Sequence, residues 1–381
     1  MNLLMVSGDR QVVLGERGPF HSMQREFSRY FERIDVLCPK PTGPVTIRSI
    51  HDNVHFHPAD CGRLAMPRWI ARRGAELIEE HGHTLIVSHD YGFFYNGLGS
   101  AQLSRTTGVP YLSEIHHVPG YPVAIGLRER FDRWVARAYL RWARHRAIGF
   151  RVVNQQQMPR LMTGWGVAPE KIFILPSLYI DLEVFLPAPS PVEAVYDVCF
   201  VGRLVENKGA DRILESLRVL ASQGMPTRSV FVGKGPLADK LQRQAQAHGL
   251  DVTWIPWVDT PSDLAEIYRQ SRVCVCASTC EGGPRFTVEA MACGTPVVST
   301  PVGVMGDLLA DGRAGRLGGF EPWGFARSLE EVLRDESIRV EMGRNAAEIA
   351  RQHEYATAIG VYANGLRLMA GEAPLELEPV S

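Results

Sequence analysis

The stretch VCVCASTCEGGPRFTVEAMACGTPVVST, Val273–Thr300, holds the pattern that decides the fold. A short apolar run opens it, and a glycine-rich loop and a helix-length segment follow. Gly294 followed by Pro296 is typical of a helix end, and a second apolar run begins at that proline. A strand, a crossover helix and a further strand form the repeating unit of parallel sheets that carry helices on both faces.

The same unit recurs along the chain and predicts two α/β domains. Apolar runs such as NLLMV, TLIVS and KIFIL precede residue 180, and DVCFV, SVFV and DVTWI follow it, with amphipathic segments between them. A single core rarely grows past ~250–300 residues, so we expect two Rossmann-like domains instead of one large sheet. The expected parts are domain 1–180, domain 181–355, a helix at 356–370 that crosses back to the first domain, and a disordered tail at 371–381.

Composition narrows the class of protein. A net charge of -1 gives no support for nucleic acid as the main partner. No apolar run approaches the ~18 residues of a membrane span, and the start, MNLLMVSGDR, is typical of a buried strand and not of a signal peptide. The seven cysteines include Cys274 and Cys276, which alternate within an apolar run and are expected to face one side of a buried strand. Without a second pair at zinc spacing they predict reduced thiols in a cytoplasmic protein.

Candidate site residues follow the apolar runs, because sites in open parallel sheets form beyond the carboxyl ends of strands. Gly202, Arg203 and Lys208 follow DVCFV, and Gly233 follows SVFV. Arg203 and Lys208 lie five residues apart across a strand-to-helix turn, where a guanidinium and an ammonium could hold one phosphate group. Two solvated surface cations are the alternative interpretation.

The loop from Glu281 to Glu289 places two carboxylates around exposed backbone. Gly282 and Gly283 give access to that backbone, and a helix N-terminus near Arg285 favours an anion. Carboxylates fit beside an anion where they accept hydrogen bonds from hydroxyl groups, such as those of a sugar and a ribose. For Glu289 the alternative is an acid that stabilises the helix dipole.

Together these segments resemble the retaining family-four glycosyltransferases of the GT-B fold. The family pattern G-R-L-x-x-x-K-G corresponds to Gly202–Gly209, and G-x-G-P corresponds to Gly233–Pro236. The pattern E-x7-E, which runs into E-A-M-A-x-G-x-P-V-V, corresponds to Glu281–Val298. The resemblance covers nearly the whole chain and is specific because the three patterns occur jointly.

The resemblance implies a nucleotide-sugar donor in the second domain and a carbohydrate or lipid-linked acceptor in the first, with no metal and no further cofactor. The catalytic positions that it implies are His116, Arg203, Lys208 and Glu281. Arg203 and Lys208 would bind the diphosphate, and Glu281 the hydroxyls of the donor sugar. The donor-binding positions that it implies are Gly18, Gly202, Gly233, Trp257, Val258, Gly282, Gly283, Arg285 and Glu289. Among these, Glu289 would hold the ribose, while Trp257 and Val258 would lie near the base.

His116 follows the run PYLSEI, at the place of the family's histidine near the donor sugar and the reacting centre. A histidine that only orients its neighbours is the alternative. Pro284 stands where the family more often has a second glycine, and it cannot donate a backbone hydrogen bond. PSLYID at 176–181 replaces the common PNGVD, and LGERGPF offers one plausible backbone contact, Gly18, in place of a glycine pair. These departures leave the donor open.

Three alternative functions remain: a nucleotide-sugar epimerase of the same architecture, an NAD-dependent oxidoreductase and a catalytically silent binding module. SVFVGKGPLA satisfies G-x-G-x-x-A after a strand. Against a dinucleotide site, no acid ends the next strand and Pro236 lies within the motif. His55 and His57 alternate on one strand face, but a second set of ligands is lacking, so we predict no metal site.

The segment Arg128–Arg146 mixes many arginines with Trp134, Tyr139 and Trp142. This pattern is typical of a basic amphipathic helix that lies on anionic lipid. The favoured interpretation is a helix that packs on a core and exposes an arginine-rich face. Peripheral contact with the inner face of a membrane is therefore a further hypothesis.

Overall fold

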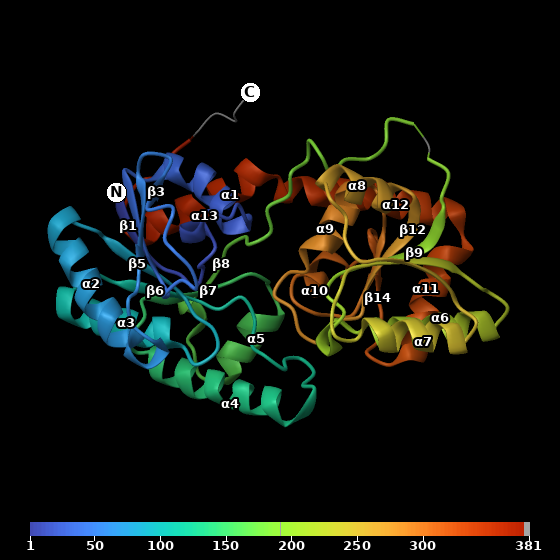
Figure 1. Cartoon of the computed structure of the whole chain (residues 1–381), viewed down its shortest axis with the longest axis horizontal. Coiled ribbons are helices and arrows are strands. Elements are labelled where there is room, and N and C mark those ends of the chain that lie inside the picture. Colours follow the sequence, from blue (N-terminus) through green and yellow to red (C-terminus); the bar gives the residue numbers. More distant parts are fainter. Residues whose placement is uncertain (191, 377–381) are drawn as a thin grey trace.

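The computed structural model of the chain describes residues 1–190 and 192–376 as two α/β domains that lie side by side (Figure 1). Each domain has one mainly parallel sheet with helices on both faces. The predicted class, two Rossmann-like domains with parallel sheets, is confirmed.

The N-terminal domain has an eight-stranded sheet in the order β3-β4-β2-β1-β5-β6-β7-β8. Its strands pair in parallel, apart from the antiparallel pair β3–β4. The strands are β1 Asn2–Val6, β2 Arg33–Cys38, β3 Ser49–Ile50, β4 Val54–Pro58, β5 Leu85–His89, β6 Tyr111–Glu114, β7 Gly149–Val152 and β8 Ile172–Ile174. The helices are α1 Pro19–Phe27, α2 Met66–His81, α3 Tyr95–Thr107, α4 Gly126–Ala143 and α5 Gln157–Gly164.

The C-terminal domain has a six-stranded parallel sheet in the order β11-β10-β9-β12-β13-β14. The strands are β9 Tyr196–Val201, β10 Arg228–Val232, β11 Asp251–Ile255, β12 Ser271–Cys276, β13 Val297–Ser299 and β14 Gly315–Leu317. The helices of this domain are α6 Ala210–Ser222, α7 Ala238–Ala247, α8 Pro261–Arg269, α9 Arg285–Ala292, α10 Met305–Leu308, α11 Pro322–Arg334 and α12 Glu336–Ala350. The last helix, α13 Tyr355–Met369, packs on the N-terminal domain.

Apolar clusters cover both faces of each sheet, which is why the strands read as continuous apolar runs. In β12, Val273 and Val275 pack into the cluster beneath α6 and α11, while Cys274 packs into the cluster on the other face. The expected alternation is therefore present in this strand. All seven cysteines are unpaired.

The pattern of apolar runs does not predict two of the strands, β3 and β14. β3 has two residues and β14 has three, and β14 begins with a glycine and an arginine, so neither forms an apolar run. Both pair with a neighbour at or near the margin of a sheet, where hydrogen bonding to the adjacent strand defines them. Among the described residues, no helix combines the length and the apolar character that crossing a membrane requires.

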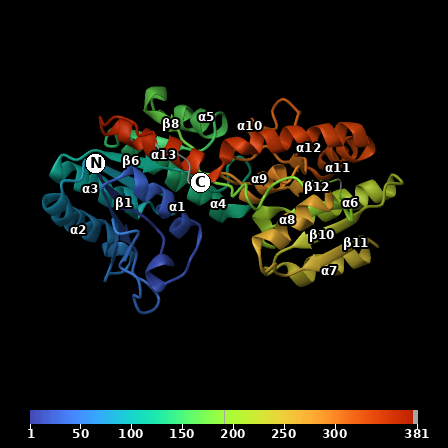
Figure 2. The ribbon, with the colours of Figure 1, turned by 90° about the horizontal axis from the view of Figure 1, so that it is seen from above.

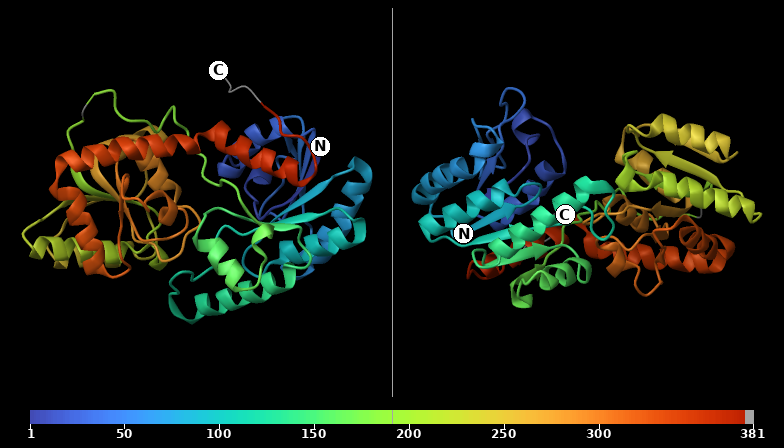
Figure 3. Two further views of the ribbon diagram at one scale, coloured as in Figure 1. Left: turned by 180° about the vertical axis from the view of Figure 1, so that it is seen from behind. Right: turned by 90° about the horizontal axis from the view of Figure 1, so that it is seen from below.

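The chain crosses between the domains at two places that touch each other. Ile180 N donates to His353 O at 2.7 Å, which joins the segment after β8 to the turn before α13. Helices α12 and α13 follow one another from the C-terminal domain to the N-terminal domain (Figures 2 and 3). There Tyr362 packs on Phe27 of α1, with ring centroids 5.0 Å apart.

Residues 371–376 of the expected disordered tail are held against α13. Asn364 donates to Leu375 O and accepts from Leu375 N, both at 2.8 Å. Arg367 Nε donates to Ala373 O at 2.8 Å. Polar side chains of α13 thus bond to the backbone of residues 373 and 375, and residues 377–381 lie outside the described residues.

The packing of α13 on the N-terminal domain predicts unequal effects for two leucines of that helix. Leu366 is fully buried in the cluster shared with α1 and β1, whereas Leu368 is 61% exposed. We expect Leu366→Ala to lower the free energy of unfolding by about 2–5 kcal/mol. Leu368→Ala should change it by less than about 0.5 kcal/mol. Urea unfolding of both variants measures this, and equal effects would contradict the packing described.

Candidate active site

The loop after β6 of the N-terminal sheet meets the loop after β12 of the C-terminal sheet through backbone atoms. The segment after β6 carries His116, and the loop after β12 carries Glu281 and Gly282. A Cβ added to Gly282 would lie 2.9 Å from the carbonyl oxygen of His116. Cys280 Sγ donates to Val118 O at 3.2 Å beside this contact. The structure therefore brings together two predicted site segments that belong to different domains.

Further hydrogen bonds between the domains flank this contact. Val123 N donates to Thr279 O at 3.4 Å. On the other side, Gln157 Oε1 accepts from Gly303 N at 2.9 Å, and Gln157 Nε2 donates to Pro301 O at 3.0 Å. The two domains thus hold the loops after β6 and β12 at a defined separation.

Lys208 and Glu281 form an ion pair between the turn after β9 and the loop after β12. Gly209 ends that turn with φ of +69°, and a Cβ there would lie 2.1 Å from the Ala277 carbonyl oxygen, so the turn requires glycine. Ser278 Oγ also donates to Glu281 Oε1, at 3.0 Å. The side chains of the pair are 15% and 14% exposed, so the charges neutralise each other in a place that still opens to solvent.

Arg203 lies beyond the end of β9 and is exposed. Among the described residues, no hydrogen bond or ion pair engages its guanidinium. The strand ends beside it approach closely, because a Cβ on Gly233 would lie 1.9 Å from Gly202 O, and Gly233 has φ of +143°. The close packing of these strand ends beside Arg203 therefore requires glycine at position 233.

Arg285 is the first residue of α9, and it pairs with Glu289 one turn later. Arg285 Nε donates to Glu289 Oε1 at 2.8 Å, and Tyr268 OH donates to Glu289 Oε2 at 3.3 Å. Burial raises the pKa of Glu289, and Arg285 opposes that rise. Two predicted site residues are thus joined to each other at the start of the helix.

Four predicted positions remain: Trp257, Val258, Gly283 and Gly18. Trp257 is 67% exposed, with Lys234 Nζ 5.2 Å from its ring centre, and Val258 is partly buried against the core. Gly283 packs on Leu178, whose Cδ2 would lie 3.1 Å from an added Cβ. Gly18 precedes α1 and has extended backbone. No hydrogen bond or ion pair between described residues joins Gly18 or Trp257 to the Lys208–Glu281 pair.

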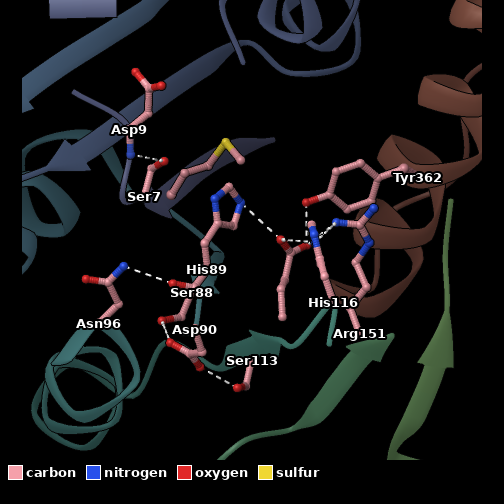
Figure 4. Close-up of polar contacts among 12 residues, drawn as sticks. Ser7, Asp9, Ser88, His89, Asp90, Asn96, Ser113, His116, Arg151 and Tyr362 are labelled. Carbon is pink, nitrogen blue, oxygen red and sulfur yellow. Dashed lines mark hydrogen bonds and ion pairs between the residues drawn. The ribbon is translucent and has the colours of Figure 1, made fainter. Parts of the chain in front are cut away.

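A buried ion pair that the sequence analysis missed lies behind His116. Glu114 and Arg151 are directly paired residues of β6 and β7, and Arg151 Nη1 donates to Glu114 Oε1 at 3.0 Å. Tyr362 of α13 donates to the same carboxylate, and His89 Nε2 lies 3.0 Å from Glu114 Oε2. Figure 4 shows His89, His116, Arg151 and Tyr362 converging from four elements. The guanidinium also lies 3.6 Å from the ring centre of Tyr362.

This cluster sets the charge of His116. Burial opposes ionisation of Glu114, but Arg151 and His89 more than offset it, so its pKa lies below the ordinary range. The His116 side chain is 46% exposed; burial of the remainder and the nearby Arg151 lower its pKa, which favours the neutral imidazole. Arg151 Nη1 lies 3.4 Å from His116 Nε2. Because a guanidinium only donates, this nitrogen accepts, and the proton of the imidazole is on Nδ1.

A second buried carboxylate, Asp90, follows β5. It accepts from Ser88 Oγ and Tyr139 OH, both at 2.7 Å, and from Ser113 Oγ. Burial raises the pKa of Asp90 to about 6, although the three hydroxyl donors oppose the rise. Figure 4 shows Ser88 and Ser113 directed at this carboxyl group. The sequence analysis missed this cluster too.

One signal for the missed pair was present in the sequence. Glu114 and Arg151 are opposite charges inside apolar strand-like runs, and such residues are almost never fully buried unless paired. Nothing local identified Tyr362 as the third partner. Within the described residues, no group of three histidine, cysteine or acidic side chains is placed to hold a metal ion. His57 instead lies 2.7 Å from Asp35 Oδ1 through its Nε2.

Comparisons with known proteins identify the family of the chain. The family model described as "Glycosyl transferase 4-like domain" matches residues 20–177, and "Glycosyl transferases group 1" matches residues 187–349. A D-inositol 3-phosphate glycosyltransferase from Paenarthrobacter aurescens is 31% identical over 296 residues, which are 71% of this chain and 69% of that protein. The chain belongs to the glycosyltransferase group 1 family.

Another relative and two solved structures extend the comparison. A D-inositol 3-phosphate glycosyltransferase from Gordonia bronchialis is 30% identical over 248 residues; the match spans 58% of this chain and about half, 53%, of that relative. Sucrose-phosphate synthase from Thermosynechococcus elongatus has a TM-score of 0.77 at 20% identity, covering 97% of this chain and 100% of that chain. HepE from Anabaena, in complex with UDP and glucose, has a TM-score of 0.72 at 19% identity with the same coverage. At these identities the structures show the shared fold.

The buried Glu114–Arg151 pair predicts that the stability of the protein falls strongly when one of the two charges is removed. Arg151→Met leaves the Glu114 carboxylate buried and unpaired, so we expect the free energy of unfolding to fall by about 3–5 kcal/mol. The double variant Glu114→Gln/Arg151→Met should lose less than Arg151→Met alone. Arg137→Met, at an exposed position of α4, is the control and should stay within about 0.5 kcal/mol of the parent. Urea unfolding measures all three, and an Arg151→Met variant as stable as the control would refute the buried pair.

Proposed function

We propose that the protein transfers a sugar from a nucleoside-diphosphate sugar to a hydroxyl group of an acceptor, with retention of anomeric configuration. The observation that supports this most is the Lys208–Glu281 ion pair, which lies in the loops that contact His116 across the domain boundary. Membership of the glycosyltransferase group 1 family supports the same reaction class. The complex of the similarly folded HepE with UDP and glucose is compatible with a nucleotide-sugar donor.

In this proposal the C-terminal domain binds the donor. Arg203, unpaired at the end of β9, and Lys208 hold the diphosphate beside Gly202 and Gly233, which are donor-binding positions of the family pattern. Glu281 accepts hydrogen bonds from hydroxyls of the donor sugar. The remaining roles follow the family pattern: Glu289 for the ribose, Trp257 and Val258 for the base, and Gly18, Gly282, Gly283 and Arg285 for the phosphates and the sugar.

The ion pair explains how one site can hold both charges before the donor binds. Lys208 neutralises Glu281 in the free protein, and Ser278 supports the same carboxylate oxygen. An arriving diphosphate competes for the ammonium of Lys208. The Glu281 oxygens are then available to sugar hydroxyls, so one exchange of partners prepares both contacts.

Bond cleavage places growing negative charge on the leaving diphosphate. Cations held at that position interact more strongly with the transition state than with the ground state, so they raise the rate as well as the affinity. With Nε2 facing Arg151 and the proton on Nδ1, His116 serves as a hydrogen-bond donor near the reacting centre without adding charge.

The acceptor class is a carbohydrate or a lipid-linked sugar held by the N-terminal domain, in polysaccharide, glycolipid or glycoconjugate synthesis. The seven unpaired cysteines fit a reducing compartment, so we place the protein in the cytoplasm as part of the proposal.

Titration with nucleotides tests the donor site. Thermal shift first selects the base among UDP, GDP and ADP, since a ligand at 100 Kd stabilises the native state by about 2.7 kcal/mol. With that nucleotide, we expect Arg203→Ala and Lys208→Ala each to weaken calorimetric binding of the diphosphate and to leave binding of the bare nucleoside almost unchanged. The double variant should lose less than the product of the single effects, because both cations contact one phosphate group. Parent-like diphosphate affinity in both folded single variants would remove these residues from the site.

Two adjacent histidines allow a matched kinetic test. We expect His116→Ala to lower kcat by roughly 10²–10³, with a smaller effect on the KM for the donor, because its contact develops at the reacting centre. His117→Ala, the control, should have a smaller effect on kcat. Nucleotide release is measured with and without acceptor. Release that needs no acceptor, or conversion of the donor to an isomer, would favour an epimerase, and binding without turnover would favour a silent module.

A further inference from the structure

Helix α4 exposes a row of large apolar side chains that no other part of the described chain covers. Leu127, Phe131 and Trp134 are 81%, 52% and 64% exposed. Their spacing places them on one face of the helix, and the rings of Phe131 and Trp134 stack with centroids 6.0 Å apart. We call Leu127, Phe131 and Trp134 the apolar row. Contiguous exposed apolar groups on a water-soluble domain mark an interaction surface.

The other aromatic residues of this segment point inward, which separates the two interpretations of its sequence. Tyr139 is buried and donates to Asp90, and Trp142 packs against the N-terminal core with Arg146 4.2 Å from its ring centre. The C-terminal half of the helix therefore packs on the core. The N-terminal half carries the apolar row.

Unpaired arginines surround the apolar row. The segment 126–146 contains seven arginines and two acids, in a chain whose net charge is -1. Arg128, Arg130, Arg137 and Arg141 are exposed, and none forms an ion pair with a described residue. Glu129, one of the two acids, is engaged by Ile125 N at 2.5 Å. The face is therefore both apolar and strongly cationic.

A hollow with room for an anionic head group adjoins the helix. Arg130 and Arg133 line a space of about 580 Å³ together with residues 122–124. Arg133 Nη2 donates to Pro122 O at 3.2 Å, but its Nε is buried and has no hydrogen-bond partner among the described residues. Arg130 is exposed and unpaired among the described residues, so its guanidinium can donate to a phosphate oxygen in this space.

In the sequence, the apolar row follows shortly after the candidate active-site segment that begins at His116. The segment from His116 to Ile125 leads directly into α4, and Val123 N within it donates to Thr279 O, two residues before Glu281. The first turn of α4 lies at the end of the helix nearer the C-terminal domain (Figures 1 and 3). A surface held by α4 would thus lie beside the loops that carry His116 and Glu281.

We propose that the N-terminal half of α4 docks on the surface of an anionic lipid bilayer, with the apolar row at the level of the head groups and the arginines on lipid phosphates. Aromatic and basic residues on one helix face are the combination that binds such an interface. A second copy of the chain is disfavoured as the occupant, because a symmetric contact would bring the unpaired arginines of both copies together. This inference stands on the surface alone and does not depend on the identity of the donor.

Sedimentation with lipid vesicles tests the proposal on the whole protein. Parent protein is mixed with vesicles of phosphatidylcholine alone or with phosphatidylglycerol, at low and high salt. We expect binding to the anionic vesicles that weakens at high salt. Trp134→Ser should weaken it by roughly tenfold. Arg130→Gln/Arg137→Gln should also weaken it, with a smaller dependence on salt. Trp323→Ser is the control, since Trp323 is 68% exposed in α11 of the other domain and should leave binding unchanged.

Three results would overturn docking: no binding to anionic vesicles at low salt, equal binding to both vesicle types, or parent-like binding of Trp134→Ser. Self-association that Trp134→Ser abolishes, without vesicle binding, would assign the row to a second copy instead. Nucleotide titration of Trp134→Ser without vesicles keeps this test separate from the proposed function. Parent-like nucleotide affinity in a variant that no longer binds vesicles is the expected outcome.

Discussion

The contact between Gly282 and the backbone of His116 is the constraint on which the site depends. It joins the loop after β12 to the segment after β6, and these belong to different domains. A Cβ at Gly282 would lie 2.9 Å from His116 O, closer than side-chain carbons normally approach a backbone oxygen. Since Glu281 precedes this glycine, the same contact fixes how near the Glu281 carboxylate comes to the histidines of the N-terminal domain. The candidate site therefore requires both domains to keep this spacing.

Two ion pairs stand on either side of that contact and differ in burial. Glu114 and Arg151 are 1% and 2% exposed, and Tyr362 and His89 complete their surroundings, so this pair has no route to exchange its partners. Lys208 and Glu281 are 15% and 14% exposed and open to solvent. A buried ion pair is costly to break. In a partly exposed pair, an anionic ligand can replace the carboxylate as the partner of the cation. The first pair fits a fixed support for His116, and the second fits a site that a substrate can enter.

The fold was predictable because it depends on local patterns. Runs such as NLLMV and DVCFV coincide with β1 and most of β9, and the glycines that permit close strand ends, Gly202 and Gly233, follow such runs. The support behind His116 was not predictable in the same way. Tyr362 and Glu114 are 248 residues apart, and no local pattern reports a partner at that separation. Likewise, composition could not say which aromatic residues of α4 face the core, because that depends on the rotation of the helix against the sheet.

The most direct test of the candidate site is a crystal structure of the protein with the nucleoside diphosphate that stabilises it most. We expect the diphosphate beyond the ends of β9 and β10, with phosphate oxygens in hydrogen-bonding distance of Arg203 and Lys208. The Glu281 carboxylate should no longer have Lys208 as its sole cationic partner, and the base should lie near Val258. A nucleotide bound elsewhere, or a diphosphate that contacts neither cation while the Lys208–Glu281 pair stays unchanged, would contradict the proposed donor site.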